Sequence, residues 1–192
     1  MYKRQAYILV TLDGNDQDEI FQRAETLAEI GDELGAFNTL VLSHPDDKRA
    51  VWAARSAFLT VIEADTEHLD EMDVVVPVDK VAEFLEHVHQ IGEKYGVGIR
   101  SFGHAGDGNL HPTFLCDKRD KEEFARVEAA VDEMFDVAIS LHGTLSGEHG
   151  IGTAKSKWME KETSRGTILF SQRLRRALDP KGLLNPTKLV GI

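Results

Sequence analysis

A glycine-rich segment between two apolar runs is the feature that most restricts how this chain can fold. Ile99–His104 and Leu110–Leu115 have the composition of strands, and an Asp-Gly pair at positions 107 and 108 lies between them. Asp-Gly is among the strongest short signals for a two-residue turn, so the sequence predicts an antiparallel hairpin. In that hairpin His104 lies directly opposite His111, because both are equally far from the turn.

The rest of the chain alternates β-type runs with segments of helical periodicity. The predicted strands are Tyr7–Leu12, Thr39–Leu42 and Asp73–Val78, and the predicted helices begin after Asp16, span Asp46–Phe58, run from Val81 to Tyr95 and extend from Phe124 to Leu141. This order favours an α+β fold, an antiparallel sheet with helices packed on one face. It is also compatible with duplicated βαβ units. The C-terminal part is predicted to be a helical tail.

Composition narrows the class of protein. The length of 192 residues fits one large domain, or a domain with a tail. A net charge of -11 argues against a nucleic-acid partner. We expect no transmembrane segment, because no apolar run approaches the ~20 residues that a membrane span needs. The start lacks the pattern of a signal peptide, and the single cysteine cannot form an internal disulfide, so a cytoplasmic location is expected.

The charge is unevenly distributed. Residues 153–192 contain nine Lys or Arg and three Asp or Glu, a net of +6, so the first 152 residues carry -17. Two explanations are open. The basic tail could be complementary to the acidic body of the same chain, or it could dock on a surface outside this chain.

Two segments carry residue types that bind metal ions. Directly opposed residues on antiparallel strands have Cβ atoms about 4.5–5.5 Å apart. His104 and His111 could therefore reach one metal ion at ~2.0–2.1 Å each. The alternative is a pair of polar histidines in an ordinary hairpin.

The second segment is the loop at residues 143–152, in which four glycines surround an adjacent Glu148 and His149. Together the two segments offer two imidazoles and a carboxylate, a set that fits zinc, iron or manganese with coordination positions left open. An open position is typical of a catalytic site. The alternative is a flexible surface loop, although Leu145 and Ile151 are apolar and argue against it.

Both segments resemble those of a known family. GHAGDGNLHPTF at 103–114, followed by SGEHGIG at 146–152, resembles the C-terminal domain of FAD-linked 2-hydroxy-acid oxidases and dehydrogenases, of the glycolate oxidase and D-lactate dehydrogenase type. WAAR at 52–55, DVVVP at 73–77 and LDPKGLLNP at 178–186 agree with this resemblance. It implies a ferredoxin-like, antiparallel cap over a flavin that is bound mainly by an N-terminal domain. Nothing in this chain resembles that flavin domain.

The resemblance assigns roles to the residues of the two segments. It implies that His104, His111 and Glu148 bind a divalent transition metal and that His149 is the catalytic base. The family reaction is the oxidation of the α-hydroxyl of a small 2-hydroxy acid to a 2-oxo acid by hydride transfer to FAD.

Outside the two segments, the resemblance implies that Arg55 binds the substrate carboxylate, for which a planar guanidinium is well shaped. An ordinary helix-surface arginine is the alternative. Asn185 is implied to contact the flavin. Members specific for larger diacids have a lysine near Glu71, so such substrates are not expected. The tail reads NPTK at 185–188 where NPGK is common, which leaves the backbone path there open.

These implications give a division of the chain. Residues 1–152 are predicted to form a substrate-binding cap domain with the metal site, and residues 153–192 a helical segment that returns to the missing FAD domain. An iron-sulfur subunit is a further partner that the resemblance allows, and association with a membrane would run through such partners. Alone, the chain is expected to be inactive. A stand-alone metal-dependent hydrolase and a non-catalytic module that binds a metal or a small acid are the alternatives.

Overall fold

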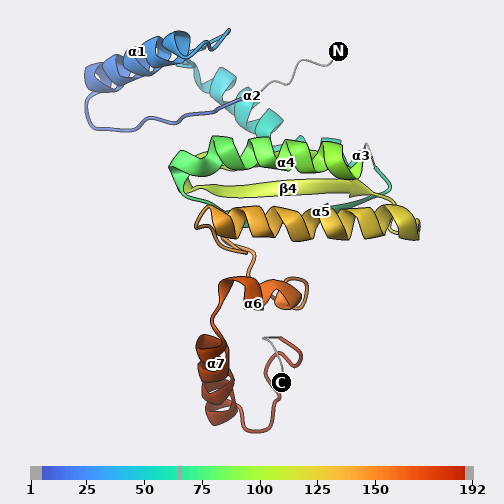
Figure 1. The fold of residues 1–192 in the computed structure, drawn as a ribbon. Coiled ribbons are helices and arrows are strands. Elements are labelled where there is room, and N and C mark those ends of the chain that lie inside the picture. Colours follow the sequence, from blue (N-terminus) through green and yellow to red (C-terminus); the bar gives the residue numbers. More distant parts are fainter. Residues whose placement is uncertain (1–5, 65, 189–192) are drawn as a thin grey trace. The chain divides into compact units, whose positions relative to one another are not determined.

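The chain folds into two compact units. The computed structural model describes residues 6–64 and 66–188, and the units comprise Met1–Phe58 and Leu59–Ile192 (Figure 1). The functional boundary predicted at residue 152 is a different division, and it stays a prediction.

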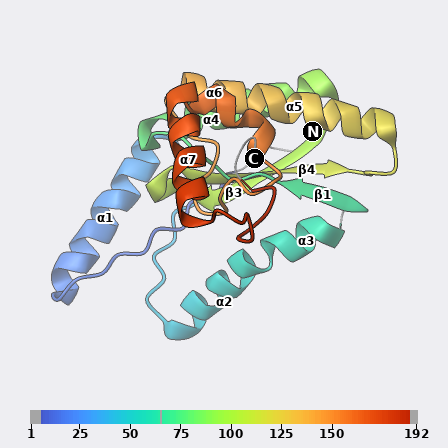
Figure 2. The same cartoon turned by 90° about the horizontal axis from the view of Figure 1, so that it is seen from below.

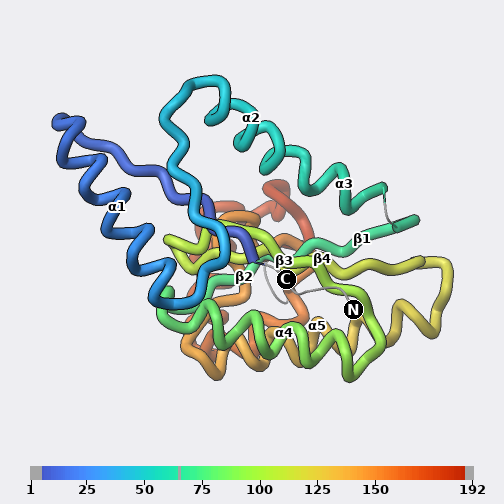
Figure 3. Tube along the Cα trace, turned by 90° about the horizontal axis from the view of Figure 1, so that it is seen from above, coloured from blue at the N-terminus to red at the C-terminus, as the bar shows by residue number. Residues whose placement is uncertain are grey.

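The first unit contains two helices, α1 (Gln17–Glu33) and α2 (Pro45–Ser56), joined by an extended connection (Figure 3). The Asp16 carboxylate caps α1 by accepting hydrogen bonds from the amides of residues 18 and 19 at 2.9 and 3.2 Å. Such a cap satisfies amides that have no partner inside the helix. The two helices predicted for this region are therefore confirmed.

The predicted strands Tyr7–Leu12 and Thr39–Leu42 are wrong, because neither segment forms a strand. Both have the β-branched composition of strands, but a strand is stable only when it pairs with another. No strand lies in the described part of the first unit. The proposed duplication of a βαβ unit is therefore not found there.

The second unit is built on an antiparallel sheet. Its strands are β1 (His68–Glu71), β2 (Val74–Val75), β3 (Gly98–His104) and β4 (Asn109–Cys116). Strand β4 is central, because it pairs with β3 on one side and with both β1 and β2 on the other. The α+β class with an antiparallel sheet is confirmed. The strand predicted at 73–78 is shorter, since Pro77 leads directly into a 3-10 turn, η1 (Val78–Lys80).

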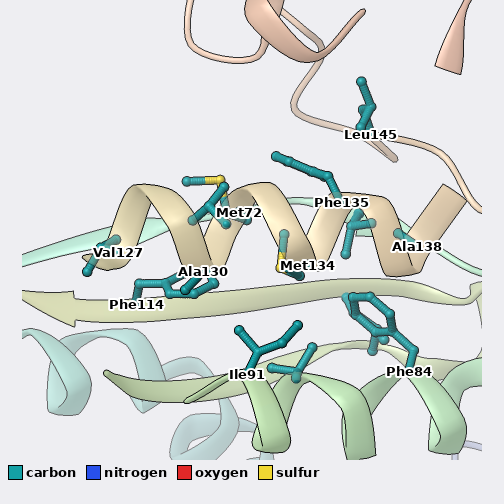
Figure 4. Packing of buried hydrophobic residues seen from close by; sticks show 14 of the residues in the cluster. Met72, Phe84, Ile91, Phe114, Val127, Ala130, Met134, Phe135, Ala138 and Leu145 are labelled. Atoms are coloured by element: carbon teal, nitrogen blue, oxygen red, sulfur yellow. The ribbon is translucent and has the colours of Figure 1, made fainter. Parts of the chain in front are cut away.

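Two long helices, α4 (Val81–Tyr95) and α5 (Lys121–Ser140), lie side by side on one face of this sheet (Figures 2 and 3). A short helix, α3 (Phe58–Ala64), precedes the sheet. The core between helices and sheet is closely packed (Figure 4). Its fully buried members include Val74, Val76, Phe84, Val88, Phe114, Val127, Ala130, Met134, Phe135 and Ala138.

The chain returns to the edge of the sheet after α5. Thr144 forms an isolated antiparallel bridge with Val75, in which its amide donates to the Val75 carbonyl at 2.8 Å. The strand order is then β3, β4, β1 with β2, and the bridge. This is the order of a ferredoxin-like sheet whose last strand is reduced to one residue. The bridge places the start of the glycine-rich loop beside β2.

The C-terminal part is helical, as predicted, with η3 (Ser156–Trp158), α6 (Met159–Glu162) and α7 (Arg165–Leu178). Beyond α7 the chain bends back on itself. The Arg175 guanidinium donates to the carbonyls of Leu184 and Asn185 at 2.5 and 2.7 Å, and Asp179 accepts from the Leu184 amide at 2.7 Å. Among the described residues, no helix has an apolar stretch long enough to span a membrane.

Two valines that follow β2 differ in burial, and this difference gives a direct test of the packing. Val76 is 1% exposed and Val78 is 57% exposed. Val76→Ala should lower the free energy of unfolding by roughly 2 kcal/mol, since it removes two buried methyl groups and leaves a cavity. Val78→Ala is the matched control and should change it by less than about 0.5 kcal/mol. Urea denaturation followed by circular dichroism measures both, and equal effects would contradict this core.

Candidate metal centre

The hairpin between β3 and β4 has a longer turn than the sequence predicts. Residues 105–107 form a 3-10 turn, η2 (Ala105–Asp107), and Gly108 follows at φ +72. The paired residues are His104 with Asn109 and Phe102 with His111, so the predicted register is wrong by two residues. A tertiary contact accounts for the difference, because the Gly108 carbonyl accepts from the Val76 amide at 3.1 Å. A Cβ at Gly108 would lie only 1.9 Å from the Val76 carbonyl oxygen.

The error leaves the predicted pair of histidines intact. Side chains on a strand alternate between faces with a period of two, so a shift of two residues keeps every side chain on its face. His104 and His111 are therefore diagonal neighbours on one face instead of direct partners. Their ring centroids are 5.8 Å apart.

Glu148 joins these histidines from the glycine-rich loop. Its Oε1 lies 3.1 Å from Nε2 of His111 and 3.7 Å from Nε2 of His104. One nitrogen or oxygen atom from each of the three residues lies within 4.8 Å of the others. The structure thus brings together the three residues predicted to bind a metal. His111 is buried, whereas the side chains of His104 and Glu148 are 45% and 53% exposed and accessible to a ligand.

His149 and Glu71 form the other half of the cluster. The His149 ring stacks on His111, with centroids 5.0 Å apart and planes inclined by 12°. Its Nε2 lies 3.9 Å from Oε1 of Glu71, which sits at the end of β1. Glu71, His111 and His149 also offer three ligand atoms within 4.8 Å of one another. His111 thus belongs to both groups, and no motif in the sequence predicts that Glu71 lies beside His149.

The environment of His111 suits a metal ligand. Burial lowers its pKa below the usual 6.5, and this effect outweighs the nearby carboxylate of Glu71, which acts to raise it. The ring is therefore neutral at pH 7, and neutral imidazole is the form that binds metals. Its Nδ1 is buried and has no hydrogen-bond partner among the described residues.

A buried carboxylate, Asp73, holds the glycine-rich loop. Its Oδ2 accepts hydrogen bonds from the Ser146 hydroxyl at 2.6 Å and from the amides of residues 147–149 at 2.9–3.2 Å. The Lys155 ammonium lies 3.3 Å from the same oxygen. Although burial acts to raise the pKa of Asp73, these hydrogen bonds and the charge of Lys155 lower it to about 2. Sequence reasoning missed both residues, because they are 82 positions apart and belong to no common motif.

The loop also packs tightly against the hairpin. A Cβ built at Gly147 would lie 2.6 Å from the side chain of Asn109, the residue paired with His104. A side chain at this position would force the amide group of Asn109 or the loop itself to move. The first half of the glycine-rich segment is therefore packed against the sheet and the hairpin, whereas a Cβ at Gly150 or Gly152 would meet nothing within 4 Å.

The two other predicted site residues lie apart from this cluster in the sequence. Arg55 is in the last turn of α2, in the first unit, and is exposed. Asn185 follows α7 in the second unit, at φ +44, and is also exposed. The roles implied for both residues stay predictions.

Comparison with known proteins identifies relatives along nearly the whole chain. Residues 2–189 match the family model described as "FAD linked oxidases, C-terminal domain". A D-lactate dehydrogenase of Anaerostipes hadrus is 38% identical over 96% of this chain, and a glycolate oxidase subunit GlcD of Bacillus subtilis is 34% identical over 96%. The chain spans 39% of the length of each relative.

A solved structure supports the fold. The chain is similar to 4-ethylphenol oxidase from Gulosibacter chungangensis, with a TM-score of 0.53 and 16% sequence identity. The similarity covers 88% of this chain and 36% of that one. At this identity the comparison concerns the fold alone, and it is consistent with an α+β cap domain.

The buried ion pair can be tested against an exposed neighbour. Lys155→Met should lower the free energy of unfolding by about 3–5 kcal/mol, because it leaves the charge of Asp73 buried without its cationic partner. Lys157→Met is the matched control, since Lys157 is half-exposed and pairs with Glu128 at 2.9 Å. It should cost at most about 1 kcal/mol. Urea denaturation measures both, and similar values for the two variants would show that the ion pair at Asp73 is not the stronger one.

Proposed function

Because the chain belongs to the family of C-terminal domains of FAD-linked oxidases, we propose that it is the substrate-binding and metal-binding part of an FAD-dependent 2-hydroxy-acid oxidoreductase. The reaction is the oxidation of an α-hydroxyl group to a 2-oxo acid. The substrate class is a small 2-hydroxy acid, and the names of the D-lactate dehydrogenase and glycolate oxidase relatives support it.

One observation carries this proposal. His104, His111 and Glu148 come from two strands and a loop, yet their ligand atoms lie within 4.8 Å of one another, and a further histidine stacks on His111. A set of three protein ligands beside an acid-base group is the arrangement expected of a catalytic metal site. The family match favours a flavin-dependent oxidation over the stand-alone hydrolase.

The chemistry of the donors fits a divalent metal such as zinc, iron or manganese. His104 and His111 supply imidazole nitrogens, and Glu148 supplies a carboxylate oxygen. His111 is buried and its lowered pKa keeps it deprotonated, so it can bind without a competing proton. When bound, the metal supplies a Lewis acid that lowers the pKa of a substrate hydroxyl, and FAD supplies the hydride acceptor.

We assign the proton transfer to His149. Its side chain is 44% exposed, and its Nε2 lies beside the Glu71 carboxylate. The stack on His111 fixes the plane of the ring, so that a substrate held at the ligand cluster meets the base in one orientation.

The remaining proposals concern two residues outside the ligand cluster and the partners of this chain. Arg55 is proposed to bind the substrate carboxylate, and Asn185 to contact the flavin. The relatives are longer than this chain, which supports an N-terminal FAD-binding domain as its partner. Residues 153–192 are proposed to return to that domain, and an iron-sulfur subunit is a further proposed partner.

Metal content tests the ligand assignment. Purified wild-type chain, reconstituted with Zn²⁺ or Mn²⁺ and freed of excess ion, should retain up to one metal ion per chain. The His104→Ala/His111→Ala double variant should lose it, because only Glu148 of the three ligands remains. The His87→Ala/His89→Ala double variant on α4 is the control and should retain it. Mass spectrometry of the bound metal measures all three, and equal content in both double variants would refute the site.

The role of His149 is tested in a polypeptide that joins this chain to its FAD-binding domain. His149→Asn should slow the reduction of the flavin by a 2-hydroxy acid by on the order of 10²–10⁴-fold, the usual contribution of a general base. Stopped-flow absorbance of the flavin under single-turnover conditions gives the rate. His89→Asn, on the exposed side of α4, should leave the rate unchanged. An unchanged rate in His149→Asn would remove it from the proton transfer.

A further inference from the structure

We propose that Asp73 is a positioning residue for the metal centre, which sets Glu148 and His149 at the correct place relative to His111. The inference rests on the proposed function in one respect, that these side chains bind the metal and transfer the proton. Asp73 itself touches none of the donor atoms, since its contacts are with loop backbone, the Ser146 hydroxyl and Lys155.

The backbone of Asp73 is fixed to the strand that carries His111. It lies at the break between β1 and β2, and its neighbours on both sides pair with β4. The Met72 amide donates to the Pro112 carbonyl at 2.9 Å, and Val74 is in register with Leu110. The backbone of Asp73 therefore has a fixed position on the sheet, next to the strand that carries His111.

The carboxylate of Asp73 then determines the path of the loop. One oxygen, Oδ2, accepts from three successive amides, those of residues 147–149. Successive amides that converge on one anion fix the backbone of a short segment, as in anion-binding nests. Because Glu148 and His149 belong to that segment, the same contact directs one side chain to His111 and stacks the other on it.

Lys155 completes the arrangement through its own contacts with Asp73. Its ammonium donates to the Asp73 carbonyl at 2.7 Å and lies 3.3 Å from Oδ2. Both residues are buried, with Asp73 at 0% and Lys155 at 5% exposure. Replacing a buried ion pair with apolar residues is often neutral for stability or even favourable. Stability alone therefore gives no reason for this pair, whereas the need to hold the loop does.

Other contacts hold the loop on the N-terminal side of Glu148 and His149. The bridge between Thr144 and Val75 fixes its start, and Glu162 accepts a hydrogen bond from the Leu145 amide at 2.9 Å. Within the described part of the chain, the amides of 147–149 are tied to the sheet through Asp73. A change at Asp73 should therefore affect the donor residues, and a change at Glu162 should not.

The test compares Asp73→Asn with Glu162→Gln, which both replace a loop-binding carboxylate by an amide of the same shape. The first readout is hydrogen exchange of the metal-free chain. The amides of residues 147–149 should lose their protection in Asp73→Asn and keep it in Glu162→Gln. The second readout is affinity for Zn²⁺, measured by competition with a chelator. Asp73→Asn should bind about 10–100-fold more weakly, the usual effect of losing a group that orients a ligand.

The outcomes separate this inference from the proposed function. If Asp73→Asn keeps both its amide protection and its affinity for Zn²⁺, the positioning role is wrong. If the wild-type chain binds no Zn²⁺, the metal assignment fails, and hydrogen exchange alone decides whether Asp73 positions the loop. If Asp73→Asn does not fold, Ser146→Ala takes its place, because it removes only the 2.6 Å hydrogen bond to Oδ2. It should lower the same protection and affinity to a smaller degree, and no change in either would overturn the proposal.

Discussion

Strand β4 uses the hydrogen-bonding groups of both its edges, and the second unit depends on this pairing. On one side β3 brings His104 next to His111, and on the other side β1 and β2 bring Glu71 and Asp73. The opposite face of β4 carries Phe114 into the core beneath α4 and α5. Because backbone groups inside a protein must be paired, these neighbours cannot leave β4 without loss of the sheet. The positions of His104, His111 and Glu71 are therefore consequences of the sheet.

The sequence was sufficient to predict the elements whose signals are local. The cap at Asp16, the helix from Val81 to Tyr95 and the hairpin strands follow from residues close together in the chain. The proximity of His104 and His111 to Glu148 could also be predicted, because the family resemblance links two segments that are distant in the sequence. The metal itself, and the roles of Arg55, His149 and Asn185, stay predictions.

The predictions that failed depend on contacts between residues that are far apart in the sequence. Tyr7–Leu12 has the propensity of a strand, but propensity does not provide a partner. The turn at Asp107 was predicted two residues too short, because its shape depends on a hydrogen bond from Val76. The sequence pattern predicts Asp73 as the first residue of a strand, whereas the loop residues that it contacts lie more than 70 positions away. Buried polar networks of this kind leave no periodic pattern in a sequence.

The shared position of His111 has a consequence for how such a site can diverge. The three proposed metal ligands and the group that contains the proposed base overlap in this one ring. Residues that share a partner do not contribute independently, so changes at His104 and His149 are coupled through it. Descendants of this chain could therefore exchange Glu71, which is not one of the three proposed ligands, with little effect on those ligands. A lineage that lost His111 would remove one of the proposed ligands and the ring on which the proposed base stacks in a single mutational step.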